Sequence, residues 1–509
     1  MSQQFNVRMV ALVCGIGLVQ PLAVRAADKP LDIGSRLEMF VDRLLIDRLD
    51  NAQLKLCEPR DEGEVLRYDQ PWEGKFCAYN TVIHDGALFR LYYRGTPVVM
   101  PDFSRQVTCY AESKDGHHWS KPKLGLHEVG GAKDNNVIFA EPGFTHNFSP
   151  FIDTRPGVPP SERFKALGGV HQVEGGLLPF VSGDGIHWSR IRDKPVITKG
   201  AFDSQNVPFW SDAEQRYVVV FRIFTGGITT AATWQPTGLR SIARATSPDF
   251  IHWSDPEPMR FEPAQEVHLY INQTHPYFRA PHLWVSTAAR FMPGRVSLTD
   301  AEAKGVEVDP AYFRQAREVS DCVLLTSRDG HTYQQTFRGA LIRPGLRLGE
   351  WVSRCGYPAL NVVQTGPAEM SLYVNQNFAQ PTMHMRRYSM RLDGFASVNA
   401  PYEGGEMTTK PLRFEGRQLM LNFATSAAGG IRVELQDADG KPIPGYAADE
   451  CVEIVGNRLE WPVRWKNGDD VGALVGRPVR LRFIMKDADL FALRFAHHTG
   501  EETAPAVGK

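Results

Sequence analysis

Apolar and polar residues alternate along most of this chain, which places every second side chain on the same face of an extended strand. Typical runs are "FRLYYRG" (89–95), "RYVVVFR" (216–222), "HLWVSTAARF" (282–291) and "EMSLYVN" (369–375). Helical patterns are confined to "SLTDAEAKG" (297–305) and "DPAYFRQAREV" (309–319), in a single interval of the chain. The pattern therefore predicts an all-β protein with a short helical insertion.

One short phrase recurs along the chain. It reads "SKDGHHWSKP" (113–122), "SGDGIHWSRI" (182–191), "SPDFIHWSDP" (247–256), "SRDGHTYQQT" (327–336) and, more loosely, "MRLDGFASVN" (390–399). Its turn aspartates are Asp115, Asp184, Asp249, Asp329 and Asp393, at intervals of 64 to 80 residues. An Asp in a turn accepts hydrogen bonds from nearby backbone N–H groups, and Gly supplies a positive φ. We therefore interpret the phrases as peripheral hairpin turns; the alternative is a ligand-binding set.

A four-stranded sheet with its turns uses roughly 45 to 70 residues, so five such units predict a five-bladed β-propeller over residues 27–400. Beyond residue 400 the phrase stops, and alternating strands with Gly and Asp turns predict a β-sandwich over 401–499. This second domain is expected to contribute no catalytic group. Residues 500–509 are predicted to be a tail.

The first residues have the pattern of a secretory signal peptide over 1–26: Arg8, an apolar run, and small residues up to Ala26. A transmembrane anchor is one alternative, but it would need a longer apolar run. A lipoprotein is another, in which Cys14 would be the lipid-modified residue. The interpretation predicts a secreted or periplasmic protein with no membrane contact after cleavage.

Composition narrows the possible partners. A formal net charge of −1 over 509 residues gives no argument for a nucleic-acid partner. The six cysteines after Cys14 contain no C-x-x-C pair, which disfavours a zinc site. They could form disulfides in any of 15 pairings, or they could be buried free thiols, and the sequence does not choose between these two states. We expect no required cofactor, a structural Ca²⁺ as a possibility, and a carbohydrate partner. The oligomeric state is left open.

An exported chain with five such hairpins followed by a β-sandwich resembles the exported five-bladed β-propeller glycosidases, which include invertase- and levanase-like, arabinanase-like and neoagarobiose-hydrolase-like enzymes. The resemblance implies a glycoside hydrolase that acts at the propeller axis on plant or algal poly- or oligosaccharides. The invertase-like W-M-N-D-P-N-G motif is absent: aligned on the Asp85-Gly86 turn, its nucleophile position falls near Cys77. The second-blade Arg-Asp-Pro is replaced by Phe148-Ser149-Pro150, so fructan specificity is not implied.

Glycoside hydrolysis usually needs two carboxyl groups across the scissile bond. Asp203, Glu266 and Glu369 each stand beside a strand expected to be innermost in its blade, with amides or aromatic residues next to them. We predict that these three catalytic carboxylates meet in one funnel at the axis. Crowding there would raise the pKa of at least one of them.

Further polar residues precede or alternate with the same strands, as hydrogen-bonding groups do in a sugar site. The candidates for substrate binding are Asn80, His146, Asn147, Gln205, Asn206, Tyr270, Asn272, His275, Arg279, His282 and Asp321. His275 or His282 could serve as a general acid in place of a carboxylic acid. The irregular spacing of the histidines disfavours a metal site.

Two other functions stay open. A lectin-like propeller would bind carbohydrate through the same polar residues without cleaving it. A sialidase-like enzyme would need three clustered arginines and a Tyr backed by Glu, with Arg94, Arg222, Arg279 and Arg290 as candidates. Two facing carboxyl groups would favour the hydrolase, and three clustered arginines would favour the sialidase.

Overall fold

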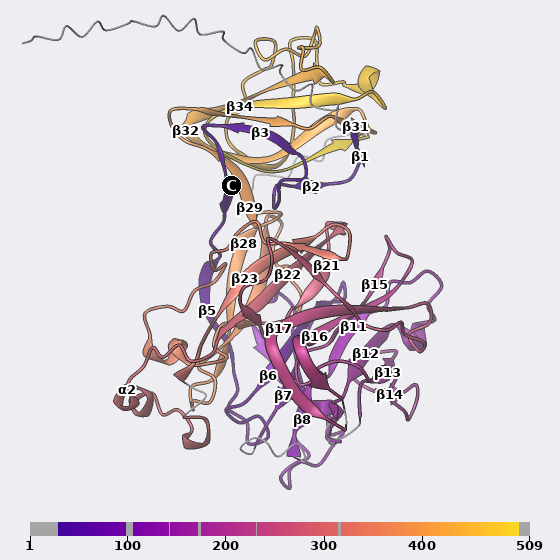
Figure 1. Ribbon diagram of the computed structural model, residues 1–509, viewed down its shortest axis with the longest axis vertical. Helices are drawn as coiled ribbons and strands as arrows, with labels where there is room; N and C mark the ends of the chain where they lie inside the picture. Colours follow the sequence, from indigo (N-terminus) through magenta and orange to yellow (C-terminus); the bar gives the residue numbers. More distant parts are fainter. Residues whose placement is uncertain are drawn as a thin grey trace, which may run out of the picture.

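The computed structural model describes residues 29–97, 105–141, 143–171, 175–230, 232–313 and 317–497. The described chain is all-β and forms two units, a propeller and a smaller domain at one side of it (Figure 1). The predicted signal peptide and tail lie outside the described residues. Within the described ranges, no helix has the length and apolar character needed to cross a bilayer.

Three blades are continuous in sequence. The first has β6 (Ala78–His84), β7 (Phe89–Gly95), β8 (Val107–Ser113), β9 (Trp119–Ser120) and β10 (Val137–Phe139). The second has β11 (Ser149–Ile152), β12 (Phe164–Gly168), β13 (Leu178–Ser182) and β14 (Ser189–Arg190). The third has β15 (Val207–Ser211), β16 (Arg216–Thr229), β17 (Trp234–Ser247) and β18 (Glu257–Pro258). In each, the first strand is innermost and the chain proceeds outwards through antiparallel neighbours.

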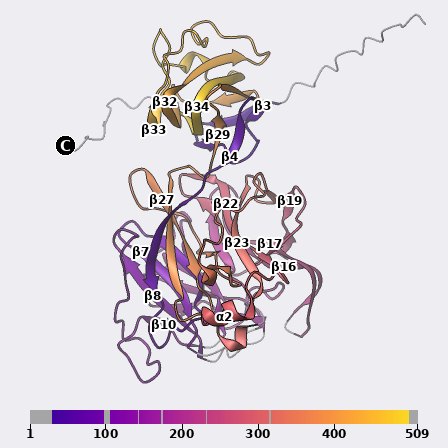
Figure 2. The ribbon, with the colours of Figure 1, turned by 90° about the vertical axis from the view of Figure 1, so that its left-hand side faces the viewer.

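The other two blades have a divided inner strand. In the fourth, β20 (His268–Leu269) and β21 (Thr274–Tyr277) pair with β22 (Ala280–Met292), followed outwards by β23 (Val319–Ser327), β24 (Thr332–Gln334) and β19 (Arg260–Glu262). In the fifth, β25 (Tyr357–Pro358) and β26 (Val363–Gln364) pair with β27 (Glu369–Gln376), which pairs with β28 (His384–Arg391). The outer strand of the fifth blade is β5 (Arg60–Arg67), which comes from the N-terminal side and closes the ring (Figure 2).

The second domain is one ten-stranded sheet folded around its own apolar core. It contains β29 (Ala396–Ala400), β30 (Gly405–Thr409), β31 (Leu412–Phe414), β32 (Gln418–Asp437), β33 (Asn457–Pro462) and β34 (Val479–Ala496). Four N-terminal strands complete it: β1 (Leu31–Gly34), β2 (Glu38–Met39), β3 (Ile46–Asp50) and β4 (Gln53–Leu56). The predicted propeller start at residue 27 is therefore wrong, because residues 31–56 find their backbone partners in the C-terminal sheet.

The repeated phrase forms the turn before the outer strand in each of the first four blades. In the first, the Asp115 carboxylate accepts hydrogen bonds from the backbone N–H groups of His117 and His118, at 2.8 and 2.9 Å. Asp184, Asp249 and Asp329 accept the equivalent bonds in their blades. The residue after each Asp has a φ of 69 to 75°. These aspartates hold turns, as predicted.

Three of these turns also accept a hydrogen bond from the preceding blade. Tyr92 of the first blade donates a hydrogen bond to the Gly185 carbonyl of the second, at 2.9 Å. Tyr373 of the fifth donates to the Gly116 carbonyl of the first, at 2.7 Å, and Arg244 of the third to the Gly330 carbonyl of the fourth, at 2.9 Å. In these blades the turn therefore links neighbouring sheets as well as joining two strands.

The fifth aspartate differs from the prediction. Asp393 is fully buried between the propeller and the second domain. Its carboxylate accepts hydrogen bonds from the Tyr277 hydroxyl (2.9 Å), Arg279 Nε (3.0 Å) and, across the domain boundary, Asn422 Nδ2 (3.0 Å). The phrase here leads from β28 into β29 of the other domain, so it has no outer strand of its own blade to enter.

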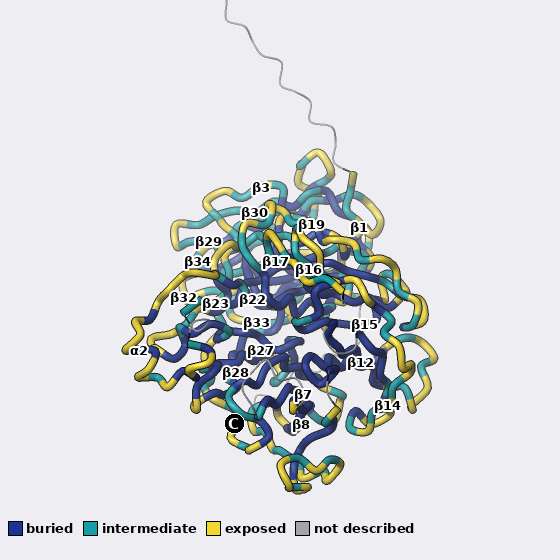
Figure 3. Tube along the Cα trace, turned by 60° about the horizontal axis from the view of Figure 1, so that its bottom comes forward, coloured by how far each residue is buried: buried dark blue, intermediate teal, exposed yellow. Residues whose placement is uncertain are grey.

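The insertion in the fourth blade carries the helix α2 (Asp300–Gly305), which begins with a capping box formed by Thr299 and Glu302. It lies at the edge of the molecule, whereas the strands around the propeller centre are buried (Figure 3).

The six described cysteines are free thiols, and five of them are buried.

Asp393→Ala should destabilise the protein more than Asp184→Ala. Removing Asp393 takes away the buried acceptor shared by Tyr277, Arg279 and Asn422, which costs about 3 kcal/mol although Arg279 keeps its pair with Glu460. Asp184 is half exposed, and its loss removes turn hydrogen bonds worth about 1 kcal/mol. Scanning calorimetry would compare both with Asp193→Ala, an exposed control. Equal shifts in Tm for the two variants would contradict the assignment of Asp393 as the interdomain anchor.

Candidate functional site

The innermost strands bring one residue from each blade to the same end of the axis. Tyr79 lies at the start of β6, His146 just before β11, Asp203 just before β15, Tyr270 between β20 and β21, and Tyr357 at the start of β25. The inner strands contact one another around the ring, and a parallel bridge joins Thr81 to Leu360 where it closes. Residues nearly 280 positions apart in sequence therefore meet.

These five residues line one small cavity of about 40 Å³. Its other lining residues are Ala78, Arg94, Asn375, Phe378 and Arg354. Asp203 is the single carboxylate among the lining residues, and its side chain is 38% exposed. The cavity is therefore polar, ringed by aromatic side chains, and open at the carboxylate.

Asp203 is held by His146. The His146 Nε2 atom lies 2.9 Å from Asp203 Oδ1, and its Nδ1 atom lies 3.2 Å from a guanidinium nitrogen of Arg94. The ionised carboxylate can only accept, so Nε2 carries a proton and donates it to Asp203, while Nδ1 also lies 2.9 Å from Gln106 Oε1. Asp203 Oδ1 is thus engaged, and no described residue donates a hydrogen bond to Oδ2.

The surroundings keep Asp203 ionised. Burial raises the pKa of Asp203, but the hydrogen bond from His146 and the charges of Arg222 and Arg354 outweigh it and hold the pKa well below its usual range. Burial and the nearby charge of Arg94 lower the pKa of His146 to about 4, against the opposing effect of Asp203. At neutral pH the pair is a neutral imidazole hydrogen-bonded to a carboxylate.

Guanidinium groups and phenol rings surround this pair. Arg222 and Arg240 lie with their central carbons 5.1 and 5.3 Å from the centre of the Tyr270 ring. Arg354 donates to the Tyr270 hydroxyl at 3.2 Å, and Arg94 lies 4.8 Å from the centre of the Tyr79 ring. Cation–π contact of this kind stabilises charges that have little water around them.

Two of the lining residues have strained backbones. Tyr79 has a φ of 57° and Arg354 a φ of 65°, in the left-handed region that non-glycine residues rarely adopt. Such conformations persist where the surrounding structure imposes them, and they concentrate at functional sites. The strain aims both side chains at the cavity, which supports its assignment as the functional site.

Two of the three predicted catalytic carboxylates do not line the cavity. Glu266 is exposed and pairs with Arg338 at 3.0 Å. Glu369 pairs with Arg387 at 2.8 Å and accepts a hydrogen bond from Thr365. The prediction that three carboxylates share one funnel is therefore wrong: in blades four and five, Tyr270, between the two halves of the inner strand, and Tyr357, at the start of β25, lie at the axis instead.

Most of the amide side chains that were predicted to bind substrate instead form hydrogen bonds within the protein, largely to main-chain carbonyls. Asn147, Asn206 and Asn272 donate to main-chain carbonyls beside the inner strands. Asn80 donates to the Tyr68 hydroxyl and to Asn375, which itself lines the cavity. Gln205 donates to Thr81 Oγ1 at 2.9 Å and accepts from Gln273 at 2.7 Å, which links blades one, three and four across the axis. These buried amides form the floor beneath the site.

The remaining candidates lie away from the cavity. His275 accepts a hydrogen bond from the Val362 backbone, and burial lowers its pKa to about 4. Arg279 pairs with Asp393 at 3.0 Å, and His282 lies 3.4 Å from Glu38 at the domain boundary. Asp321 pairs with Arg290, with Arg290 Nε at 2.8 Å. Neither His275 nor His282 is placed to act as a general acid beside Asp203.

Sequence reasoning missed several lining residues. Tyr79, Tyr357 and Arg354 carried no motif, although the first two begin inner strands. Arg94 ends the run "FRLYYRG", where it pairs in register with Ala78 at the start of β6. Cys77, at the expected position of an invertase-like nucleophile, is fully buried and donates to the Glu73 carbonyl.

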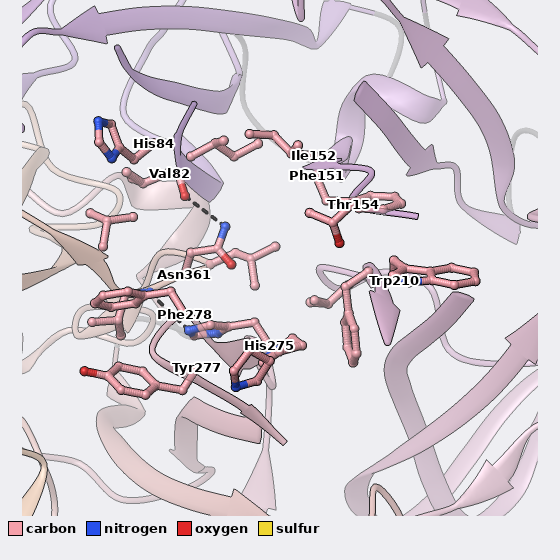
Figure 4. Close-up of a pocket in the computed structure, with 18 of the residues that line it drawn as sticks. Val82, His84, Phe151, Ile152, Thr154, Trp210, His275, Tyr277, Phe278 and Asn361 are labelled. Carbon is pink, nitrogen blue, oxygen red and sulfur yellow. Dashed lines mark hydrogen bonds between the residues drawn. The ribbon is translucent and has the colours of Figure 1, made fainter. Parts of the chain in front are cut away.

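A larger hollow of about 460 Å³ lies at the opposite end of the inner strands. Figure 4 shows its apolar walls, with Phe151, Trp210 and Tyr277 around it. Several of its polar groups are paired: Asn361 donates to the Val82 carbonyl, and Trp210 donates to Asp212. This hollow is separated from Asp203 by the amide floor and offers no reactive pair among the described residues that line it.

The described residues contain no group of three His, Cys, Asp or Glu side chains arranged to hold a metal ion. A structural Ca²⁺ stays a prediction.

No protein-family model matches the sequence, and no curated protein matches it. The chain is similar to solved structures of an N-acetylgalactosamine deacetylase from F. plautii (15% identity, 67% of this chain and 96% of the other, TM-score 0.42) and of an RGII complex of BT0996 (14%, 65% and 92%, 0.42). It is also similar to a protein described as a glycoside hydrolase (9%, 84% and 98%, 0.39). At these values the similarity assigns no activity to this chain.

Carbon-13-labelled histidine would test the His146–Asp203 pair by NMR. The resonance of His146, identified by its loss in His146→Gln, should stay constant from neutral pH down to about 5 and titrate with a midpoint of about 4. Asp203→Asn should lower that pKa further, because it removes the negative charge that favours imidazolium. Arg94→Gln should raise it. A wild-type midpoint near 6.5 would show that the ring is not buried among cations.

Proposed function

We propose that this protein is an exported glycoside hydrolase that cleaves a poly- or oligosaccharide at the propeller axis. The observation that carries the proposal is an ionised, partly exposed carboxylate, Asp203, at the point where all five blades meet. Aromatic faces and hydrogen-bonding groups around it suit a sugar ring, which presents apolar C–H faces and hydroxyls. Export rests on the signal-peptide pattern of residues 1–26.

Asp203 would act as nucleophile or general base. His146 fixes Oδ1, which leaves Oδ2 to attack the anomeric carbon or to take a proton from water. The hydrogen bond from His146 and the charges of Arg222 and Arg354 lower the pKa of Asp203, so the carboxylate is ionised at neutral pH. Retention of the anomeric configuration in the product would identify a nucleophile, and inversion would identify a base.

The leaving group also needs a proton donor, and no second carboxyl group lines the cavity among the residues that the structure describes. Burial raises the pKa of Tyr79, and burial with the nearby Tyr270 raises that of Tyr357, so both phenols stay protonated. The buried Tyr357 hydroxyl has no hydrogen-bond partner within the described part of the chain. We propose Tyr357 as the group that hydrogen-bonds the departing oxygen.

A lectin-like function is the second candidate. The small volume of the cavity favours it, because about 40 Å³ admits one substituent of a sugar and not a whole ring. Both candidates use the same residues for binding, and they differ in whether Asp203 reacts. The sialidase-like alternative is weaker: Arg94 and Arg222 lie near the axis, but Arg279 and Arg290 are paired elsewhere, and no carboxylate among the described residues hydrogen-bonds Tyr270.

Asp203→Asn should reduce turnover roughly 10²- to 10⁴-fold on whichever oligosaccharide the wild type cleaves, because the amide neither attacks nor accepts a proton. Substrate affinity should change far less. Glu266→Gln is the matched control: its carboxylate is exposed and pairs with Arg338, so turnover should stay near that of the wild type. Product release from a panel of oligosaccharides measures both. Near-normal turnover in Asp203→Asn would remove Asp203 from the mechanism.

A further inference from the structure

The charges around the axial cavity do not balance. Arg94 and Arg354 line it, Arg222 lies against the ring of Tyr270, which also lines it, and Asp203 is the single carboxylate among the lining residues. His146 cannot add a positive charge, nor can Tyr79 or Tyr357 add a negative one at neutral pH, because burial favours their neutral forms. The formal charge of this group is therefore +2. Buried charge without a counter-charge is costly, so its presence points to a ligand that supplies one.

Arg222 carries this argument furthest. Its side chain is 3% exposed, yet no hydrogen bond or ion pair with any described residue involves its guanidinium group, and its Nε atom is buried without a partner. The guanidinium is held only between two rings, 5.1 Å from the centre of Tyr270 and 5.5 Å from the centre of Phe224. Its five N–H donors, next to the Tyr270 ring, thus have no partner among the described residues.

Buried arginines elsewhere in the blades are paired. Arg90 pairs with Asp85 at 2.6 Å, Arg244 with Glu214 at 2.5 Å and Arg387 with Glu369 at 2.8 Å. The fold therefore supplies a carboxylate where an arginine serves only structure. At the axis it supplies aromatic faces, which stabilise a cation without occupying its donors.

Arg354 is the second unsatisfied cation. It lines the cavity, is partly exposed, and has a single side-chain hydrogen bond, to the Tyr270 hydroxyl. Its strained backbone, with φ at 65°, holds it against Tyr270, the ring that Arg222 also contacts. The two guanidinium groups thus contact the same phenol ring, and the charges of both lower the pKa of Asp203.

We propose that the axial cavity binds an anionic substituent of the sugar, a carboxylate or a sulfate ester, at Arg354, and that the charge of Arg222 behind the Tyr270 ring adds to the attraction. This inference rests on the proposed carbohydrate function and names its substrate class. The planar guanidinium donates two parallel hydrogen bonds to such a group. A cavity of about 40 Å³ has room for roughly three waters, which is the size of one such substituent. The sugar ring would then lie at the mouth, beside Asp203 Oδ2.

Binding of matched glycans tests the proposal. Oligosaccharides rich in uronic acid would be compared with the same material after carboxyl reduction, and sulfated oligosaccharides with their desulfated forms, by calorimetry on the wild-type protein at two salt concentrations. One acidic form should bind at least about tenfold more tightly than its neutral counterpart, with weaker binding at higher salt. The pair that shows the difference identifies the substituent. Equal binding of both forms in both pairs would overturn the proposal.

Variants separate a charge site from general loss of structure. Arg354→Gln should remove the preference for the acidic form, and Arg222→Gln should weaken it, while binding of the neutral form persists. Arg354→Lys keeps the charge but not the two-pronged geometry, so part of the preference should remain. Arg338→Gln, which alters an exposed pair with Glu266, is the control and should keep the full preference. Loss of the preference in the control, or its retention in both glutamine variants, would overturn the assignment.

Hydrolysis measured on the same glycans distinguishes the two proposals. Tight binding of an acidic glycan that is never cleaved would support the anion site and reject the hydrolase. Cleavage of neutral glycans without preference for an acidic form would support the hydrolase and reject the anion site.

Discussion

The axial site exists only because β5 pairs with β28. That antiparallel pairing runs from Arg60–Ser389 to Arg67–His384 and gives the fifth blade its outer strand. At the centre, the Leu360 N–H donates to the Asn80 carbonyl and the Val82 N–H to the Leu360 carbonyl, so the inner ring closes at the same junction. If either contact opened, Tyr79 and Tyr357 would separate, and the cavity would lose one wall.

A closed ring leaves an axis that must be filled. The structure fills its middle with amides, since Gln273 donates both to Gln205 and to the Pro358 carbonyl. Hydrogen-bonded amides are uncharged and tolerate burial, so they can seal the ring without competing with the charged groups above them. The seal divides the axis into a polar end with Asp203 and an apolar end with Phe151 and Trp210.

Local features of the structure could be predicted from the sequence, and non-local ones could not. The turns at Asp115 and Asp184 follow from seven adjacent residues, so their geometry was predictable. Asp203 and His146 were found because each directly precedes an unbroken inner strand. Glu266 was misplaced because the inner strand of its blade is divided, and nothing in the local pattern marks where the axial half begins. The strands at 31–56 alternate like any others, and only pairing with residues almost 400 positions away identifies their domain.

The order in which the chain is made has a consequence for the second domain. The propeller occupies a continuous stretch inserted between the two halves of that domain, entered after β4 and left through β29. During synthesis β1 to β4 therefore emerge first and remain without backbone partners until the last hundred residues follow. Unpaired strand edges of this kind invite association with other chains. The strands β1 to β4 are therefore synthesised before the propeller but can pair only after it, and during that interval the nascent chain is exposed to aggregation through their unpaired edges.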